Sequence, residues 1–316
     1  MITKDIQKAI EALQNDELIA LPTETVYGLA ANAYNETAIK KIFELKKRPL
    51  YNPLIVHLHS KEQLKEVAKE IPEKAKILAE KFWPGSLTLV LKKQNHIPDL
   101  VTAGKDTVAV RVPQHLVALA LLEQLDFPLV APSANPFGSI SPTSAKHVWN
   151  YFQENLPVIL DGGDCSNGVE STIIGFQGDE AVLYRHGSVS VEEIEQVIGK
   201  IEMITRNDTT PDAPGMLSKH YAPKTKIILT ENIENEIQEN SGKRIGALIF
   251  KNQTKTAIAY QEVLSAEGDL KEASKNLYAA LHRLDAMDLD IIIAERLPDS
   301  GLGITINDRL NRATKK

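Results

Sequence analysis

The sequence predicts an α/β fold, in which a twisted mixed sheet with flanking helices is followed by a smaller α/β unit. Helical and strand-like patterns alternate through the first 200 residues, and some strand patterns are separated only by turns. Such a sheet is expected to contain both parallel and antiparallel pairs. The Pro-containing stretch 205–225 has no periodicity, and a second βα alternation follows it. A stretch of this length is typical of a linker or a lid.

The first elements follow from periodicity and from stop signals. An N-terminal helix is expected because apolar residues recur at helical spacing, at Ile6, Ala9, Ile10 and Leu13. The apolar run 18–22 predicts a strand. A second helix should begin near Asn35 and must end before Pro49, because the residue before a proline disfavours helical geometry.

Three further helices are indicated by capping signals. Ser60 and Gln63 have the spacing of a capping box, as do Ser190 and Glu193. Pro72 suits the first turn of a helix that should stop at the sequence WPG. Helices are therefore expected to follow Ser60, Pro72 and Ser190.

The remaining strands appear as apolar runs bounded by turn residues. In the first 200 residues these runs are PLIVHL, SLTLVLKK, DTVAVRVP, FPLVAP, LPVILDG, ESTIIGF and AVLYRHG. After the linker come KIILT, RIGALIF, a long helix carrying Leu277, Ala280, Leu281 and Leu284, and then LDIIIAE. We therefore predict a domain at 1–204, a linker or lid at 205–225 and a small domain at 226–316.

Composition limits the classes of function. The chain has 316 residues, 43% of them hydrophobic and 25% charged, and a net charge of −6. That charge argues against a protein that coats nucleic acid, so any phosphate site must be a local basic patch. The one cysteine, Cys165, excludes an internal disulfide and a Cys-rich metal site. No stretch approaches a membrane span, and we expect a cytoplasmic protein without membrane contact.

Two strands place polar side chains on a face opposite apolar ones. At 107–112 the valines share one face, while Thr107 and Arg111 share the other. An arginine on a central strand needs an anion nearby, either a ligand or an internal Asp or Glu, and the pattern leaves both open. In the strand PLIVHL, His57 shares a face with Ile55, opposite the leucines and Val56, and a structural role is the commoner one for such a histidine. Arg185, near a strand end, suits either a ligand or solvent.

Three turns rich in hydroxyl groups accompany these bases: LPTETVYG, APSANPFGSISPTS and GVESTII. Each alone is typical of an ordinary turn. Interleaved with Lys46, Arg48 and Arg111, they favour an anionic ligand such as a phosphate or a carboxylate. No phosphate-binding P-loop, zinc spacing or nucleophile elbow accompanies them. Composition and spacing alone therefore do not identify the reaction.

The ordered set of motifs resembles a known family. PTETVYGL, KKRPLYNPLIVH, WPGSLTLVL, VAVRVP, APSANPFGSISPT, GVESTII and RHGSV occur in the order found in YrdC-like proteins. The linker APGMLSKHYAP and the closing GLGITINDRLNRA resemble the two-domain L-threonylcarbamoyladenylate synthases. The resemblance extends over essentially the whole chain.

The resemblance implies a YrdC-like sheet with a concave, basic cleft, followed by a small Rossmann-like domain. It also implies a nucleotidyltransferase that converts ATP, L-threonine and bicarbonate into L-threonylcarbamoyladenylate and pyrophosphate. This product feeds the N6-threonylcarbamoyl modification of adenosine 37 in tRNAs that read ANN codons. Other proteins complete the transfer to tRNA, and weak RNA binding is a further expectation.

The resemblance also assigns roles to individual residues. Those expected around L-threonine are Thr25, His57, Arg111, Ser133 and Ser171. Those expected around ATP are Arg48, Asn52, Thr107, the backbone of Ala131, Ser141, Arg185 and Tyr221. Lys46, Arg48 and Arg111 would stabilise charge during the reaction, and Tyr221 would contact the nucleotide from the lid.

Magnesium is expected to arrive with ATP and to be held mainly by phosphates and water, without a metal site built from protein side chains. Glu24, Asp161 and Glu170 are candidates for contact through water, and a structural role is at least as common for each.

Two other functions are compatible with the sequence. One is a module that binds tRNA or double-stranded RNA without turnover, which the acidic net charge disfavours. The other is a carbamoyl-handling relative that acts on a different acceptor, as YrdC-like domains do in hydrogenase maturation. The dedicated linker and second domain argue against that reading.

Overall fold

The structure is a computed structural model that describes residues 1–203, 213, 216 and 220–315. A large mixed sheet organises the N-terminal body, in the strand order β1-β9-β2-β3-β8-β4-β7-β6-β10-β11-β12, with β5 paired to β6. For example, β6 pairs with β10 in parallel and with β7 antiparallel. The predicted mixed sheet is therefore confirmed.

The strands of this sheet are β1 (Ile2–Thr3), β2 (Ile19–Leu21), β3 (Gly28–Asn32), β4 (Ile55–His57), β5 (Ala68–Lys69), β6 (Leu87–Lys93), β7 (Thr107–Arg111), β8 (Leu129–Val130), β9 (Val158–Leu160), β10 (Thr172–Gln177), β11 (Glu180–Arg185) and β12 (Glu202–Met203). The helices of the body are α1 (Ile6–Gln14), α2 (Glu36–Lys46), α3 (Leu64–Val67), α4 (Glu73–Phe82), α5 (Asp99–Thr102), α6 (Leu116–Leu122), α7 (Ala145–Phe152) and α8 (Val191–Ile198). Short 3-10 turns are η1 (Lys61–Gln63) and η2 (Gln153–Asn155).

Most predicted helix starts are confirmed. The Asn35 side chain accepts the backbone N–H groups of Thr37 and Ala38 at the start of α2. Ser190 and Glu193 form the complete capping box of α8.

The capping box predicted at Ser60 is wrong. A 3-10 turn, η1, stands where the first turn of an α-helix was expected, and the Ser60 side chain caps no backbone N–H group there. The Gln63 side chain instead accepts the backbone N–H of His59 at 3.0 Å. The spacing of Ser60 and Gln63 alone could not show that the Gln63 side chain would bond to the backbone of His59 and not to that of Ser60.

The central strands separate the hydrophobic core from a polar face, as their alternation predicts. Val108 and Val110 of β7 pack in the main hydrophobic core together with Leu89 of β6. On the opposite face Ala109 packs with Ile55 in a small apolar cluster. The polar side chains described below project from this second face.

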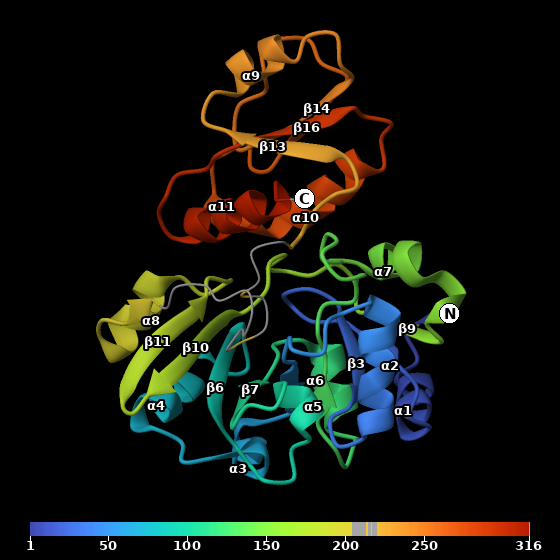
Figure 1. Ribbon diagram of the computed structural model, residues 1–316, viewed down its shortest axis with the longest axis vertical. Coiled ribbons are helices and arrows are strands. Elements are labelled where there is room, and N and C mark those ends of the chain that lie inside the picture. The colour runs from blue at the N-terminus through green and yellow to red at the C-terminus, as the bar shows by residue number, and fades with distance from the viewer. Residues whose placement is uncertain (204–212, 214–215, 217–219, 316) are drawn as a thin grey trace.

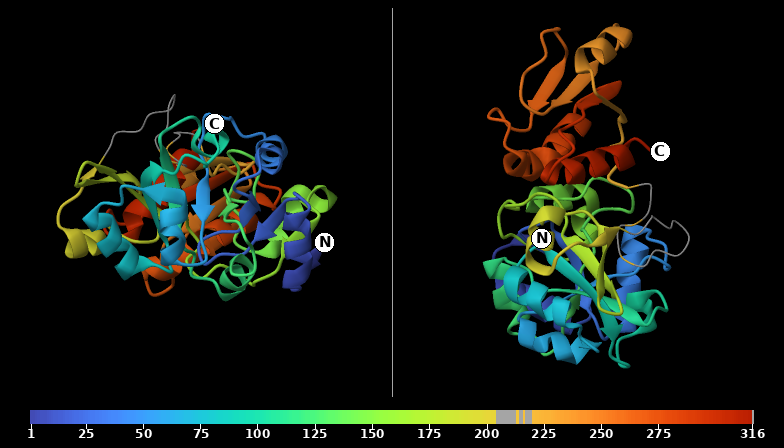
Figure 2. Two further views of the ribbon diagram at one scale, coloured as in Figure 1. Left: turned by 90° about the horizontal axis from the view of Figure 1, so that it is seen from below. Right: turned by 90° about the vertical axis from the view of Figure 1, so that its left-hand side faces the viewer.

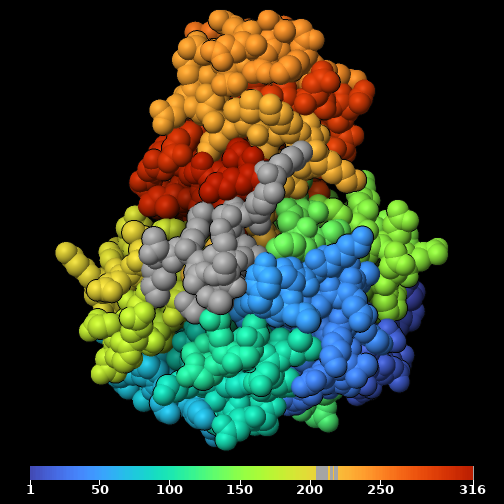
Figure 3. Space-filling model, in the orientation of Figure 1, coloured from blue at the N-terminus to red at the C-terminus, as the bar shows by residue number. Residues whose placement is uncertain are grey.

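The C-terminal unit comprises β13 (Lys226–Thr230), α9 (Ile233–Glu239), β14 (Ile245–Ile249), β15 (Tyr260–Val263), α10 (Leu270–Asp285), β16 (Ile291–Glu295) and α11 (Leu302–Ala313). Its four strands are all parallel, in the order β13-β16-β14-β15, which agrees with the small α/β unit expected from the sequence. Helices α10 and α11 lie between this sheet and the N-terminal body (Figures 1 and 2). The space-filling view shows the C-terminal unit seated on the body (Figure 3).

The domain bounds at 204 and 226 stay predictions, and most of the linker predicted at 205–225 lies outside the described residues. Within it, Ala213 and Met216 are buried against the same apolar cluster as Ile55. The backbone N–H of Ala222 bonds to the carbonyl of Gly138 at 2.8 Å. None of the helices in the described part of the chain is both long and apolar enough to span a bilayer.

Candidate active site

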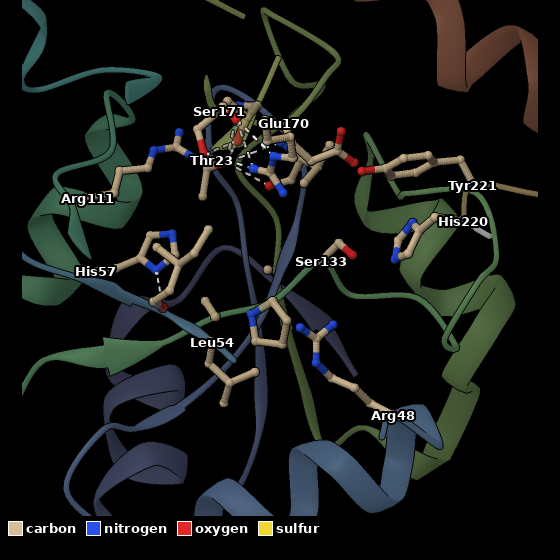
Figure 4. A pocket seen from close by; sticks show the side chains of 17 residues that line it. Thr23, Arg48, Leu54, His57, Arg111, Ser133, Glu170, Ser171, His220 and Tyr221 are labelled. Atoms are coloured by element: carbon tan, nitrogen blue, oxygen red, sulfur yellow. Dashed lines mark hydrogen bonds between the residues drawn. The ribbon is translucent and has the colours of Figure 1, made fainter. Parts of the chain in front are cut away.

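A cavity lies on the polar face of the central strands and collects side chains from distant parts of the sequence (Figure 4). The predicted site residues that line it are Thr25, Arg48, His57, Arg111, Ala131, Ser133, Ser171, Arg185 and Tyr221. Arg111 and His57 lie on one side, and Arg48, His220 and Tyr221 lie on the other (Figure 4). The predicted site residues that meet here span 196 positions, from Thr25 to Tyr221.

Arg111, at the end of β7, has an internal anionic partner. Its Nη2 lies 2.6 Å from Oε1 of Glu24, and both side chains are about 4% exposed. Its Nη1 donates to the Thr25 hydroxyl at 2.9 Å, and its Nε donates to the carbonyl of Gly85 at 3.1 Å. Burial alone would raise the pKa of Glu24, but Arg111 and Ser86 hold it below its ordinary value. The internal salt bridge left open by the sequence therefore exists.

Ser171 connects two strands at the cavity wall. Its hydroxyl lies 2.7 Å from the Thr88 hydroxyl of β6. Arg185, at the end of β11, donates through Nη2 to both the hydroxyl and the carbonyl of Ser171, at 3.2 and 2.8 Å. Gly187 is required beside this turn, because a Cβ there would lie 2.2 Å from the carbonyl carbon of Ser171. The sequence ESTII and the sequence RHG therefore build one wall.

Arg48 is a buried cation in the cavity wall. Its Nη2 and Nε donate to the carbonyls of Pro53 and Asn52, at 2.8 and 3.2 Å. Burial and the charge of Arg185 lower the pKa of Arg48 to about 9. Burial likewise lowers the pKa of Arg185 to about 10, against the opposing effects of Tyr221 and Glu170. Two buried guanidinium groups that repel each other and line one cavity favour an anion in that cavity.

Lys46 is fully buried but does not line the cavity. Its Nζ donates to the carbonyls of Ser133 and Asn135, and burial, followed by the charge of Arg48, lowers its pKa well below the ordinary value. In the structure Lys46 thus holds the loop that presents Ser133.

Three residues predicted at the nucleotide do not themselves line the cavity. Asn52 is fully buried, and neither atom of its side-chain amide has a hydrogen-bond partner among the described residues. Ser141 is buried and donates to Glu170 at 2.7 Å. Thr107, at the start of β7, lines a separate surface pocket with Asp106. Ser141 is one hydrogen bond from the cavity, through Glu170, and the contact of all three residues with ATP stays a prediction.

His57 faces the cavity in its neutral form. Burial and the charge of Arg111 lower its pKa to about 3, and its Nδ1 lies 3.2 Å from the carbonyl of Ile55. Because that carbonyl can only accept, Nδ1 carries the proton, and Nε2 is the nitrogen without one. At neutral pH His57 can therefore contribute hydrogen bonding to the site but no charge.

Tyr221 and His220 close the opposite side. Tyr221 has a left-handed backbone (φ 65°) and is 1% exposed. The guanidinium carbons of Arg309 and Arg312 lie 5.0 and 4.7 Å from its ring centroid, within the range of cation–π attraction. Its ring also stacks on Tyr278 at 5.7 Å. Three groups of the C-terminal unit thus fix Tyr221.

The sequence did not predict the contribution of the C-terminal unit to the site. Glu170 lines the cavity, and Arg309 donates to its Oε2 at 2.9 Å. A signal was present, because Arg309 and Arg312 are three residues apart and share the buried stripe of α11 with Leu310. Two arginines on an apolar stripe indicate buried partners.

The carboxylates proposed for magnesium differ in their surroundings. Both oxygens of Glu170 accept hydrogen bonds, and Oδ1 of Asp161 accepts the backbone N–H of Gly163 at 3.0 Å. Oε2 of Glu24 is buried and has no hydrogen-bond partner among the residues that the structure describes. Across the described part of the chain, His, Cys, Asp and Glu side chains nowhere gather in a group of three or more that would hold a metal ion.

Two family models match the sequence. Residues 11–187 match the Sua5/YciO/YrdC family, whose description reads "Telomere recombination". Residues 189–314 match "Threonylcarbamoyl-AMP synthase, C-terminal domain". The first match alone covers more than half of the chain.

The chain belongs to the Sua5/YciO/YrdC family. It is similar to the threonylcarbamoyl-AMP synthase of Pyrococcus abyssi, with 43% identity over 98% of this chain and 94% of that protein. The enzyme of the same name from Bacillus subtilis is 41% identical, over 98% of this chain and 92% of that protein. The crystal structure of P. abyssi Sua5 complexed with L-threonine superposes with a TM-score of 0.92 at 42% identity, covering 98% of this chain and 94% of that one. The family and the fold expected from the sequence are therefore confirmed.

Proposed function

We propose that this chain synthesises L-threonylcarbamoyladenylate and pyrophosphate from ATP, L-threonine and bicarbonate, and is therefore a nucleotidyltransferase. The observation that carries the proposal is the pair of buried guanidinium groups, Arg48 and Arg185, facing one cavity. Near-full-length similarity to threonylcarbamoyl-AMP synthases, one of them crystallised with L-threonine, supports the choice of substrates.

The reaction needs positioning more than a nucleophilic side chain. The amine of threonine forms a carbamate, with release of water from bicarbonate or of a proton when CO2 reacts. A carbamate oxygen then attacks the α-phosphorus as pyrophosphate leaves. Such transfers depend on orientation and on stabilisation of developing charge. Cys165 is not a candidate nucleophile for this reaction, because its thiol is buried with a raised pKa and does not line the cavity.

We place threonine beside Arg111 and the hydroxyl groups that surround it. The guanidinium would attract the carboxylate, and its salt bridge to Glu24 would fix the orientation of the guanidinium plane. Thr25, Ser133 and Ser171 offer hydroxyls to the polar groups of the amino acid. Neutral His57 can bind there without adding charge.

We place the nucleotide beside Arg48 and Tyr221, on the side opposite Arg111. Arg48 and Arg185 would meet the phosphates, and Tyr221 would cover them. Lys46 would act through the Ser133 loop, to which its ammonium group is bonded. Magnesium would enter with ATP as part of the substrate, held by phosphate and water oxygens. Glu24 Oε2 is buried without a partner among the described residues, but Glu24 is paired with Arg111 and does not line the cavity, so we assign it no contact with the ion.

The product would serve as the first intermediate in the N6-threonylcarbamoyl modification of adenosine 37 in tRNAs that read ANN codons. An acyl adenylate is labile in water, so the proteins that transfer the group to tRNA should accept it directly. We place this pathway in the cytoplasm, which the free, buried Cys165 supports.

The test is pyrophosphate release from ATP, measured with each substrate omitted in turn. We expect release to require threonine and bicarbonate together, and to fall when magnesium is chelated. Release that is unchanged without threonine would refute the assignment.

RNA binding needs a separate measurement. We expect at most weak tRNA binding, because the net charge is −6. A salt titration of tRNA binding distinguishes this from an RNA-binding module. Tight, steeply salt-dependent binding without pyrophosphate release would favour the module.

A further inference from the structure

A carboxylate in the cavity wall is held by the C-terminal unit. Oε1 of Glu170 accepts the Ser141 hydroxyl at 2.7 Å and the Tyr278 hydroxyl at 3.1 Å. Its Oε2 accepts Nε of Arg309 at 2.9 Å and the Tyr278 hydroxyl at 3.0 Å. Tyr278 belongs to α10 and Arg309 to α11. Both oxygens of a cavity residue are therefore bonded from outside the N-terminal body.

The backbone around Glu170 is docked equally closely. A Cβ on Gly168, which has a positive φ, would lie 2.3 Å from the carbonyl oxygen of Lys275 in α10. Arg309 also donates to the carbonyl of His186 at 2.7 Å, and Thr305 donates to that of Gly187 at 3.0 Å. These contacts fix the segment that precedes Ser171 and the segment that follows Arg185. Arg309 itself is fully buried, so solvent screens its charge little, and its Nη1 also donates to Asp308 at 2.7 Å, a carboxylate that Arg312 shares.

The charge of Glu170 has consequences for an anionic ligand. Glu170 and Arg185 line the same cavity, and their charges attract each other. A carboxylate that Arg309 did not balance would draw the guanidinium of Arg185 toward itself and repel phosphates. Balanced by Arg309, the same carboxylate leaves the cavity positive.

We propose that Arg309, assisted by Tyr278, is a positioning residue for nucleotide binding: it neutralises Glu170 from the C-terminal unit, so that the positive charge of Arg185 acts on the phosphates of the nucleotide. The proposal rests on the proposed function, since it takes the anion to be a nucleotide. It gives the C-terminal unit a direct electrostatic part in the site.

The test is MgATP binding to the full chain by isothermal titration calorimetry. Arg309→Gln should raise the Kd for MgATP about 10- to 100-fold, the range of one charge-assisted hydrogen bond. The Kd for L-threonine should change far less. Adding Glu170→Gln should restore most of the MgATP affinity, because the unbalanced charge is then gone. A purely structural role for Arg309 would not give this rescue.

A matched control shows whether the rise in Kd for MgATP is specific to Arg309 or follows the loss of any ion pair in the C-terminal unit. Arg283, on the exposed part of α10, bonds to Glu262 at 2.7 and 2.8 Å. Arg283→Gln should leave the Kd for MgATP unchanged.

The pH dependence gives a second readout. Loss of Arg309 removes the largest of the interactions that lower the pKa of Glu170, so that pKa should rise, while Arg185, Arg312, Tyr278 and Ser141 still act on it. Lowering the pH then protonates Glu170 and should narrow the difference in Kd between Arg309→Gln and the unchanged protein. The unchanged protein serves as the reference for titration of ATP itself.

The outcomes are distinguishable. If the wild-type protein does not bind MgATP, the proposed function is refuted. Normal binding there, with no loss in Arg309→Gln or with a loss that Glu170→Gln does not relieve, overturns only this inference. If Arg309→Gln does not fold, Tyr278→Phe removes one donor and keeps the ring. It should raise the Kd about 2- to 10-fold, as for a single hydrogen bond, and no change would refute the proposal.

Discussion

Arg111 and Arg48 face the same cavity and are held in different ways. Arg111 has a buried carboxylate partner, Glu24, with 2.6 Å between Nη2 and Oε1. Arg48 bonds to backbone carbonyls, and none of the described carboxylates pairs with it. The strand pattern predicted that Arg111 needs an anion, but it could not identify Glu24, which lies 87 positions away in an irregular turn. An internal ion pair balances the charge of Arg111. We expect an anionic ligand to balance the charge of Arg48.

We expect Arg111→Met to destabilise the fold more than Arg48→Met does. Removing Arg111 leaves Glu24 buried and unpaired, which costs about 3–5 kcal/mol. Removing Arg48 also removes a cation whose pKa is lowered by burial and by Arg185, so relief of that repulsion offsets part of the loss. Urea unfolding of both variants gives the comparison. Equal losses would contradict the distinction between them.

At the scale of the element, strands β4, β6 and β7 each divide two environments. Leu89 faces the main core, while the neighbouring Val90 packs in the apolar cluster beside the cavity. Alternation of this kind was readable from the sequence because the side-chain period of a strand is two residues. The start of the short helix after Ser60 was not readable, since a 3-10 turn and an α-helix can follow the same residues.

Leu89→Ala should therefore lower stability without altering the site. The fully buried side chain leaves a cavity that costs about 2–5 kcal/mol. Below the melting temperature, KM for threonine and for ATP should stay as they were. Calorimetry and initial rates test this together, and a large change in KM would show that the two faces of the strand are coupled.

At the scale of the whole molecule, the two units share an interface containing two stacked histidines. His147 of α7 and His282 of α10 have ring centroids 4.0 Å apart. His282 Nε2 donates to the carbonyl of Ser141 at 3.1 Å, and His147 Nδ1 accepts the backbone N–H of Thr143 at 3.3 Å. Burial lowers the pKa of His282 to about 4 and that of His147 to about 3, the latter with help from the charge of His282. Both rings are therefore neutral in the docked state.

The fold should lose stability as the pH falls from 6.5 toward 4. In this window the unfolded chain binds a proton at His282 that the folded chain excludes, so each such histidine costs about 1.4 kcal/mol per pH unit. His282→Gln should make the dependence shallower by that amount. Charged neighbours that act on the pair are Asp285, Arg283 and Lys146. Unfolding free energies at several pH values test this, and an unchanged slope would mean that His282 titrates normally.

The sequence by itself determined the family, the mixed sheet, the small parallel unit after it and the identity of the basic and hydroxyl residues. These depend on local periodicity, turn chemistry and ordered motifs, which adjacent residues encode. Only the tertiary structure decided which of these groups meet. It paired Arg111 with Glu24, set Thr107 apart and brought Arg309 to Glu170 across 139 positions. Contacts at such separations depend on how helices and sheets dock, and no short stretch of sequence specifies that.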